Sequence, residues 1–417
     1  MWTPEGHGTM RKTNNQGSGP VSRREMIQVV GAAASAGLMA PAIARAQQLG
    51  QAIEPRTVVS TPPRDFGPDA PPSVYFSDPD VLTIDPAFDA LVQPNAAIQR
   101  LWTGGLWLEG PAWSNVGRFL VFSDIPANRQ YRWLEDDGHV SVFRYPANNS
   151  NGNTFDFQGR QLSCEHLTRR VVRYEHDGTI TVIADRWDGR RFSSPNDVAP
   201  HPDGSYWFTD PPYGASLYEG QPDEAGGPTN PAGLLRPRIG QPPEAGSMRR
   251  ELPNAIYRVD PDGRVERVAT EEQVPNPNGL CFSPDYRRLY VSSTGRGPGD
   301  EHEGGQGDLH VFDVTEDNRL VNHRLFSDCM VDGIKCAPDG VRCDVHGNVW
   351  ASSNAGRVIG YSGVTVWNPE GRLIGRIRLP EVCGNICFGG AKRNRLFMAA
   401  STSLYALYVN TQGAAIG

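Results

Sequence analysis

Ser205-Tyr206-Trp207-Phe208-Thr209-Asp210 is the stretch from which the fold of this chain can be read. It is a short strand-like segment that ends in an acidic residue and leads directly into a turn at 211–214. Segments of the same kind, each ending in a small or acidic residue, recur along the sequence at 119–124, 161–166, 289–293, 348–352 and 395–400.

Hairpin signals lie between these segments. Asp-Gly or Glu-Gly pairs occur at Asp137-Gly138, Asp177-Gly178, Asp262-Gly263 and Glu370-Gly371, and such pairs favour tight β-turns. Six units of about 40 to 60 residues match the blade period of a β-propeller. The sequence therefore predicts an all-β, six-bladed β-propeller. A β-sandwich is the main rival, but it would not bring distant turns onto one axis.

The chain divides into three predicted parts. Residues 1–46 read as a twin-arginine signal peptide, because Arg23 and Arg24 precede an apolar stretch at 29–42 and a small-residue cleavage site at 44–46. Residues 47–73 are rich in proline and polar residues and read as a linker. Residues 74–417 form the propeller, in which 74–106 supplies a strand that closes the ring and 214–250 is an insertion loop.

Charge and cysteine content restrict the function. The formal net charge is −7, and removal of residues 1–46 makes it −10, because five basic and two acidic residues are lost. An acidic protein is a poor ligand for nucleic acid or anionic lipid, so neither is an expected partner, and no membrane is expected after signal removal. The predicted location is the periplasm, reached through the twin-arginine machinery. Seven cysteines leave at least one thiol without a partner in the chain.

Four segments place an oxygen-bearing side chain beside a turn. They are Leu108-Glu109-Gly110-Pro111, Ser194-Pro195-Asn196-Asp197, Pro277-Asn278-Gly279-Leu280 and Pro338-Asp339-Gly340-Val341. Two carboxylates and two carboxamides suit a hard divalent cation such as Ca²⁺. In a ring these segments can meet, so the sequence predicts one metal held by Glu109, Asn196, Asn278 and Asp339. Ca²⁺ is the first choice, with Mg²⁺, Mn²⁺ or Zn²⁺ as alternatives.

These motifs resemble the gluconolactonase/regucalcin-like (senescence marker protein) family, which is similar in architecture to diisopropyl fluorophosphatase. The likeness covers roughly residues 95–410 and lies in Glu109–Trp113, Asn196–Val198, 278–280 and 339–340. The segments 151–154 and 208–214 resemble its bacterial gluconolactonase branch. The resemblance implies a six-bladed ring with one divalent metal at the channel mouth, held by the same four residues.

Two positions depart from the pattern of these relatives. Ser194 stands where regucalcin-like members have an arginine, which affects how a sugar acid would be recognised. Arg342 stands where the fluorophosphatase relatives have the acid of a second, buried Ca²⁺ site, which argues against that site here.

The resemblance implies a metal-dependent lactonase that opens a gluconolactone-like sugar lactone to its aldonic acid. Asp339, Asp197 and Asp210 are the candidate catalytic acids, with the identity of the general base left open. Asn151, Asn153 and His166 are the candidate substrate-binding residues. Two alternatives stay open: a phosphotriesterase-like hydrolase on the same propeller, and a non-enzymatic propeller that is stabilised by metal and binds other molecules.

Overall fold

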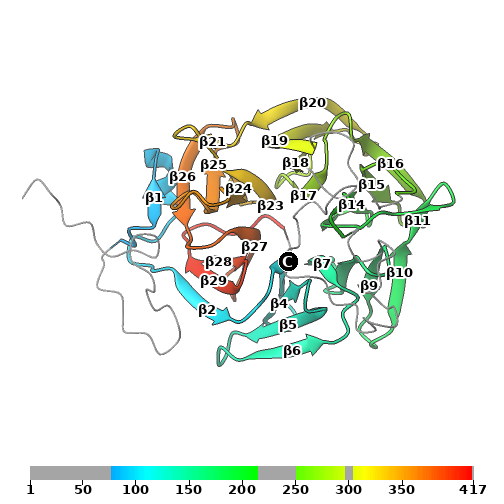
Figure 1. Ribbon diagram of the computed structural model, residues 1–417, viewed down its shortest axis with the longest axis horizontal. Helices are drawn as coiled ribbons and strands as arrows, with labels where there is room; N and C mark the ends of the chain where they lie inside the picture. Colours follow the sequence, from blue (N-terminus) through cyan, green and yellow to red (C-terminus); the bar gives the residue numbers. More distant parts are fainter. Residues whose placement is uncertain (1–76, 215–249, 296–303, 416–417) are drawn as a thin grey trace, which may run out of the picture. The chain divides into compact units, whose positions relative to one another are not determined.

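The computed structural model describes residues 77–214, 250–295 and 304–415. Within them, six sheets of four or five antiparallel strands stand around a central axis (Figure 1). This confirms the predicted six-bladed β-propeller. The predicted signal peptide, the linker and nearly all of the predicted insertion loop lie outside the described residues. Among the helices that the structure describes, none is long and apolar enough to cross a membrane.

Each of blades 1 to 4 is built from four consecutive strands, with the innermost strand first. Blade 1 comprises β3 (Leu108–Ser114), β4 (Phe119–Asp124), β5 (Arg129–Leu134) and β6 (Val140–Arg144). Blade 2 comprises β7 (Ser150–Phe155), β8 (Gln161–Glu165), β9 (Arg170–Tyr174) and β10 (Ile180–Ala184). Blade 3 comprises β13 (Val198–Pro200), β14 (Tyr206–Asp210), β15 (Ala255–Val259) and β16 (Val265–Thr270). Blade 4 comprises β17 (Pro277–Phe282), β18 (Arg288–Gly295), β19 (Gly304–Val314) and β20 (Leu320–Ser327).

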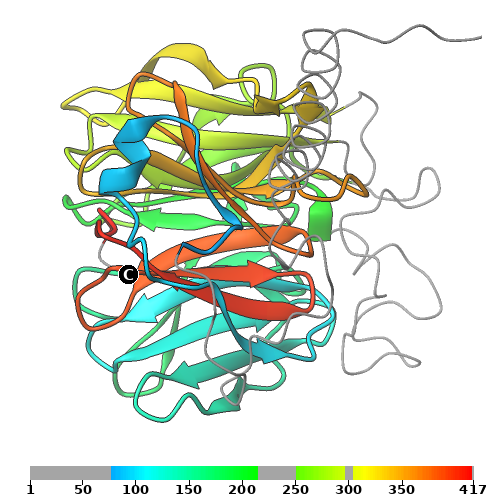
Figure 2. The same cartoon turned by 90° about the vertical axis from the view of Figure 1, so that its left-hand side faces the viewer.

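Blades 5 and 6 each include a strand from the N-terminal end of the described chain. Blade 5 comprises β23 (Ala337–Cys343), β24 (Val349–Asn354), β25 (Gly363–Trp367), β26 (Leu373–Arg378) and β1 (Val81–Thr83). Blade 6 comprises β27 (Cys383–Gly389), β28 (Arg395–Ala400), β29 (Ser403–Tyr408) and β2 (Gln99–Thr103). Figure 2 shows β2, in cyan, beside the red strands of blade 6. The predicted closure of the ring by 74–106 is therefore present.

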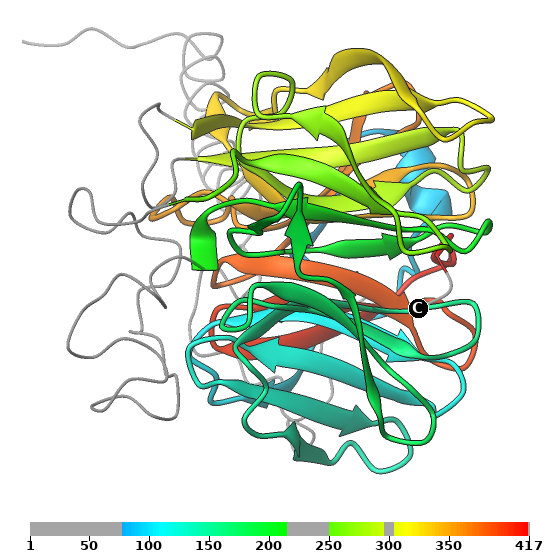
Figure 3. The same ribbon diagram turned by 90° about the vertical axis from the view of Figure 1, so that its right-hand side faces the viewer.

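Three short elements complete the described chain. They are the 3₁₀ helix η1 (Pro86–Ala90) and the two-stranded pairs β11 (Arg186–Trp187) with β12 (Arg190–Arg191) and β21 (Met330–Val331) with β22 (Ile334–Lys335). Figure 3 shows the other side of the ring, where the blades follow one another from teal through green to yellow.

The hydrophobic core lies between neighbouring blades. Trp113 of blade 1 stacks on Phe397 of blade 6, with ring centroids 5.8 Å apart. Trp207 of blade 3 meets Phe282 of blade 4 edge-on at 5.4 Å. Because each apolar cluster belongs to two blades, burial of apolar surface fixes the order of blades around the ring. All seven cysteines are buried, free thiols.

Candidate active site

A pocket on the channel contains all four predicted metal ligands. It encloses about 590 Å³ of space, open solvent at its mouth included. Its polar lining includes Glu109, Asn151, His166, Asn196, Asn278 and Asp339. The four predicted ligands come from blades 1, 3, 4 and 5, so the ring brings together residues that are far apart in the sequence.

Bulges in the innermost strands turn these side chains towards the channel. The pairing register shifts between Glu109 and Ala112 in β3, between Pro277 and Leu280 in β17, and between Pro338 and Val341 in β23. A bulge leaves an extra residue unpaired and redirects its side chain. Asn196 lies just before β13, where its N–H donates to the Thr209 carbonyl at 2.9 Å.

Glycines beside the ligands allow the inner strands to approach one another closely. A Cβ on Gly110 would collide with the Asn151 carbonyl. One on Gly152 would collide with the backbone at Asn196 and Asp197. The same backbone contact recurs between Gly279 and Asp339, whereas a Cβ on Gly340 or Gly384 would collide with the side chain of Asn385 or Glu109. The Glu-Gly, Asn-Gly and Asp-Gly pairs of the sequence therefore supply both the ligand and the space that the next blade needs.

In four blades a hydroxyl group in the second strand bonds to the inner strand of the next blade, and in two of these cases the acceptor is a predicted ligand residue. Ser123 Oγ donates to the Asn151 carbonyl at 2.8 Å, and Thr209 Oγ1 donates to the Asn278 carbonyl at 2.6 Å. Two equivalent bonds run from Ser292 Oγ to the Asp339 carbonyl at 2.5 Å and from Ser352 Oγ to the Gly384 carbonyl at 2.7 Å. The small residues that end the repeated segments thus position the site, a role that the sequence analysis missed.

Burial makes the two pocket carboxylates hard to ionise in the absence of a cation. Burial raises the pKa of Glu109 to about 7, and the negative charge of Asp197 adds to the rise, while bonds from the Gly110 N–H and the Asn385 amide oppose it. Burial raises the pKa of Asp339 well above its ordinary value, and the charges of Glu109 and Asp197 raise it further. A bound cation would remove this penalty.

The pocket donors fit a hard cation. Asn278 Nδ2 donates to Thr294 Oγ1 at 3.0 Å, which leaves its Oδ1 for the pocket. In the same pocket, the buried Oδ1 of Asn151 has no hydrogen-bond partner. Within the described parts of the chain, no three His, Cys, Asp or Glu side chains gather as metal ligands. A cation here would therefore depend on amide oxygens as well as carboxylates, as Ca²⁺ sites do.

Asp197 is placed next to the pocket, but its carboxylate is engaged elsewhere. Its Oδ2 accepts from Arg342 Nη1 at 3.0 Å, and its Oδ1 accepts from the Val198 N–H at 3.0 Å. The Asp197 side chain is fully buried and that of Arg342 is 9% exposed. Arg342 therefore supplies the positive charge next to these acids from within the protein.

Two other predicted site residues do not line the pocket. Asp210 accepts from the Ser193 and Ser194 N–H groups at 2.9 and 2.7 Å, so its carboxylate fixes the turn before Asn196. Burial raises the pKa of Asp210 to about 7. Asn153 Nδ2 donates to the Gly110 carbonyl at 2.9 Å and thereby joins blade 2 to blade 1. Asp210 and Asn153 therefore support the backbone around the pocket and do not line it.

His166 and Asn151 do line the pocket, as predicted for substrate-binding residues. Their Nε2 and Nδ2 atoms are 3.5 Å apart. Burial lowers the pKa of His166 to about 3, so the imidazole is neutral near neutral pH. Its buried Nδ1 has no hydrogen-bond partner. The pair thus gives this side of the pocket a polar, uncharged wall.

Comparisons with known proteins agree with this arrangement. A model of the family described as SMP-30/Gluconolactonase/LRE-like region matches residues 107–402. A gluconolactonase of Zymomonas mobilis is 27% identical over 353 residues, which are 80% of this chain and 87% of the relative.

Two solved structures extend the comparison. A gluconolactonase of Xanthomonas campestris is 32% identical, with a TM-score of 0.62 over 79% of this chain and 94% of that one. A calcium-binding regucalcin of Agrobacterium tumefaciens is 19% identical, with a TM-score of 0.53 over 76% and 95% of the two chains. The latter likeness concerns the fold.

Proposed function

This chain belongs to the SMP-30/gluconolactonase/LRE-like family, and from that premise we propose that it is a lactonase that opens a sugar lactone to its aldonic acid with the help of one bound divalent cation. Hydrolysis of lactones follows from its gluconolactonase relatives. The cation and the sugar are the parts of the proposal that await experiment, with Ca²⁺ as the first choice of metal.

One observation carries the proposal of a cation. Glu109 and Asp339 are buried at one pocket, and burial raises the pKa of each. Asp197 already has Arg342 as its partner, so when all these groups ionise, two negative charges stay unbalanced. A divalent cation held by Glu109, Asn196, Asn278 and Asp339 balances them. When bound, it would polarise the lactone carbonyl and stabilise the oxyanion that develops.

Asp339 is the group that we assign as general base. Glu109 is held by the Gly110 N–H at 3.1 Å and by Asn385, and Asp197 is held by Arg342. Asp339 has no side-chain hydrogen-bond partner among the residues that the structure describes, so one carboxylate oxygen can hold the cation while the other accepts a proton. In this proposal it takes the proton of the attacking water, whose oxygen bonds to the carbonyl carbon. The ring C–O bond then breaks, and the departing oxygen takes the proton back from Asp339 to give the hydroxy acid.

The remaining lining residues orient the substrate. Asn151 and His166 line the space from blade 2, and we assign them to the ring hydroxyls of the sugar. Trp107 and Ile125 supply apolar wall beside them. A sugar lactone presents both surfaces, since its hydroxyls lie at the rim of an apolar ring.

Metal analysis and lactone hydrolysis together test the proposal. Purified protein is assayed for bound metal, and acid release from five- and six-membered aldonolactones is followed by pH-stat before and after chelation. Asp339→Asn is expected to lower kcat by about 100-fold or more, and Asn196→Ala to lower metal affinity. Asp137→Asn, in an exposed hairpin turn, is the control.

Three results would count against the proposal. Turnover of aryl phosphotriesters without lactones would favour the alternative hydrolase. Full lactonase activity in metal-free protein would show that the reaction does not require a cation. Loss of metal in Asn196→Ala with no change in any hydrolysis would favour a binding protein.

We also propose that the protein is exported to the periplasm through the twin-arginine route. The paired Arg23 and Arg24, followed by an apolar stretch, support this. Cell fractionation of the natural chain and of Arg23→Lys/Arg24→Lys tests it. Equal periplasmic amounts of the two would contradict it.

A further inference from the structure

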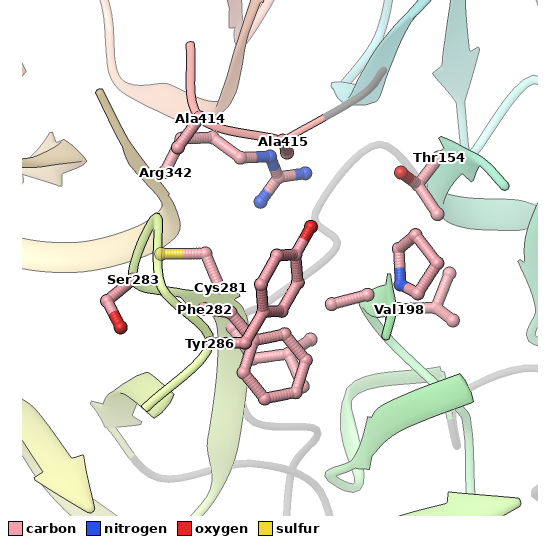
Figure 4. A pocket seen from close by; sticks show the side chains of 12 residues that line it. Thr154, Val198, Cys281, Phe282, Ser283, Tyr286, Arg342, Ala414 and Ala415 are labelled. Carbon is pink, nitrogen blue, oxygen red and sulfur yellow. The ribbon is translucent and has the colours of Figure 1, made fainter. Parts of the chain in front are cut away.

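A second pocket lies at the other end of the inner strands. Its lining includes Val198, Leu280, Phe282, Tyr286, Arg342 and Ala415, and it encloses about 450 Å³ of partly open space (Figure 4). None of the four candidate metal ligands lines it. Asn278, at the candidate active site, and Phe282, at this pocket, are four residues apart in β17, which corresponds to about 13 Å along a strand.

Arg342 presents unused hydrogen-bond donors to this second pocket. Its Nη1 donates to Asp197 Oδ2 at 3.0 Å and to the Val341 carbonyl at 2.7 Å. Its Nε and Nη2 have no partner among the described residues, although the side chain is only 9% exposed. Figure 4 shows the guanidinium directed into the pocket. A buried guanidinium with free donors favours an acceptor, and two adjacent N–H groups match a carboxylate.

Tyr286 directs a hydroxyl towards the same space. It occupies the turn between β17 and β18 with a φ of +58°, a left-handed conformation that is uncommon for a bulky residue. The equivalent turns of blades 3 and 5 have Gly204 and Gly347 with positive φ. The turn thus places a phenol at the pocket in Figure 4, beside the guanidinium.

The charged groups near the pocket favour the binding of one anion. Arg393 is near enough to Tyr286 for its positive charge to act on the phenol. The nearby carboxylate of Asp285 accepts from Ser283 Oγ at 2.6 Å and from the Arg287 N–H at 3.1 Å. Asp197, the other acid close by, accepts from Arg342. The neighbouring acids are thus engaged, and the free donors of Arg342 are available.

We propose that this second pocket is a binding site for a small monocarboxylate. The carboxylate accepts from Nε and Nη2 of Arg342 and from the Tyr286 hydroxyl, and its apolar end lies against Val198, Leu280 and Phe282. A singly charged ligand fits better than phosphate, because Asp197 shares the same guanidinium and would repel a second negative charge. The site is separate from the lactonase function and does not depend on it.

Metal-free protein gives the cleanest test, because a cation at the candidate active site would itself bind carboxylates. Butyrate is titrated by calorimetry against butyramide, which has the same shape without the charge. Butyrate is expected to bind at least about tenfold more tightly, since charge-assisted bonds are about twice as strong as neutral ones. Inorganic phosphate is a third arm, and we expect it to bind more weakly than butyrate.

Cys281 provides a readout beside the pocket, because the residue belongs to the lining while its sulfur lies 3.7 Å from that of Cys343. Its rate of alkylation, followed by peptide mass spectrometry, is expected to fall when butyrate is present and to stay unchanged with butyramide. Ala415→Phe, which fills the pocket, should abolish both binding and protection. Tyr286→Phe should weaken binding several-fold. Asp339→Asn, at the other pocket, should leave the affinity for butyrate unchanged.

The outcomes separate clearly. Equal affinity for butyrate and butyramide, or unchanged binding in Ala415→Phe, would overturn the proposed site. Loss of butyrate binding in Asp339→Asn would place the anion at the candidate active site instead. Tighter binding of phosphate than of butyrate would contradict the ligand class. None of these results bears on lactone hydrolysis, so the two proposals fail independently.

Discussion

Replacing Arg342 with methionine would test what stabilises the centre of the ring. Arg342 lies in β23 of blade 5, and Asp197 directly precedes β13 of blade 3. Their bond, 3.0 Å long between side chains that are 9% and 0% exposed, therefore links two non-adjacent blades. Methionine keeps most of the length of the side chain but leaves Asp197 as a buried carboxylate without a cation.

The expected loss is about 3–5 kcal/mol of unfolding free energy, the usual cost of removing one partner from a buried ion pair. The charge of Asp197 also raises the pKa of Glu109 and Asp339, so an uncompensated Asp197 makes those acids harder to ionise. In Asp197→Asn/Arg342→Met both charges are gone, and asparagine Oδ1 can still accept from the Val198 N–H. We expect the double variant to recover about 2 kcal/mol or more of the loss.

Denaturant unfolding of metal-free protein, extrapolated to water, measures these differences. Arg264→Met is the matched control, because Arg264 is 64% exposed although it pairs with Asp260 and Glu266, and its loss should cost about 1 kcal/mol or less. The reasoning would be refuted if Arg342→Met were as mild as the control, or if the double variant were less stable than Arg342→Met alone.

Three further predictions concern the supports of the site. Burial lowers the pKa of His166 from its ordinary value of 6.5 to about 3. Below pH 6.5 the unfolded chain therefore takes up a proton that the folded chain does not, so the free energy of unfolding falls as the pH drops towards 3. His166→Gln should flatten this part of a pH–stability curve. Gly152→Ala should cost about 2 kcal/mol or more, because its Cβ meets backbone, whereas Gly295→Ala, with open space around it, should stay within about 0.5 kcal/mol in the same unfolding assay. Ser292→Ala, which removes a bond from blade 4 to the Asp339 carbonyl, should cost about 1–3 kcal/mol, and no change would contradict the role of these hydroxyls.

The ring was predictable because its repeat is local. A segment such as Tyr206–Asp210 carries its own strand and turn signals, and six of them set the number of blades. The closing strand was also predictable, since a propeller needs its ends to pair, but the addition of β1 to blade 5 as a fifth strand was not. The predicted signal peptide, linker and insertion loop stay predictions, because the structure does not describe residues 1–76, 215–249 or 296–303.

The gathering of Glu109, Asn196, Asn278 and Asp339 at one pocket was predictable because each stands at the same place in its blade. Their use as metal ligands remains a prediction. Asp210 and Asn153 show the limit of this reasoning. Their residue types suit catalysis or sugar binding, but backbone hydrogen bonds decide where they point. Asp210 accepts from the Ser193 and Ser194 N–H groups, and Asn153 donates to the Gly110 carbonyl. Such bonds depend on the assembled ring.

Arg342 shows what only the assembled ring could reveal. The sequence indicated that an arginine here argues against a second buried Ca²⁺ site, but not that it would pair with Asp197 and present donors to another pocket. A guanidinium carries a permanent charge that does not depend on ion concentration. With Asp197 balanced in this way, Glu109 and Asp339 are the two acids among the described lining residues of the pocket, and one divalent cation would match their combined charge. The electrostatics of the channel therefore favour a single ion rather than two.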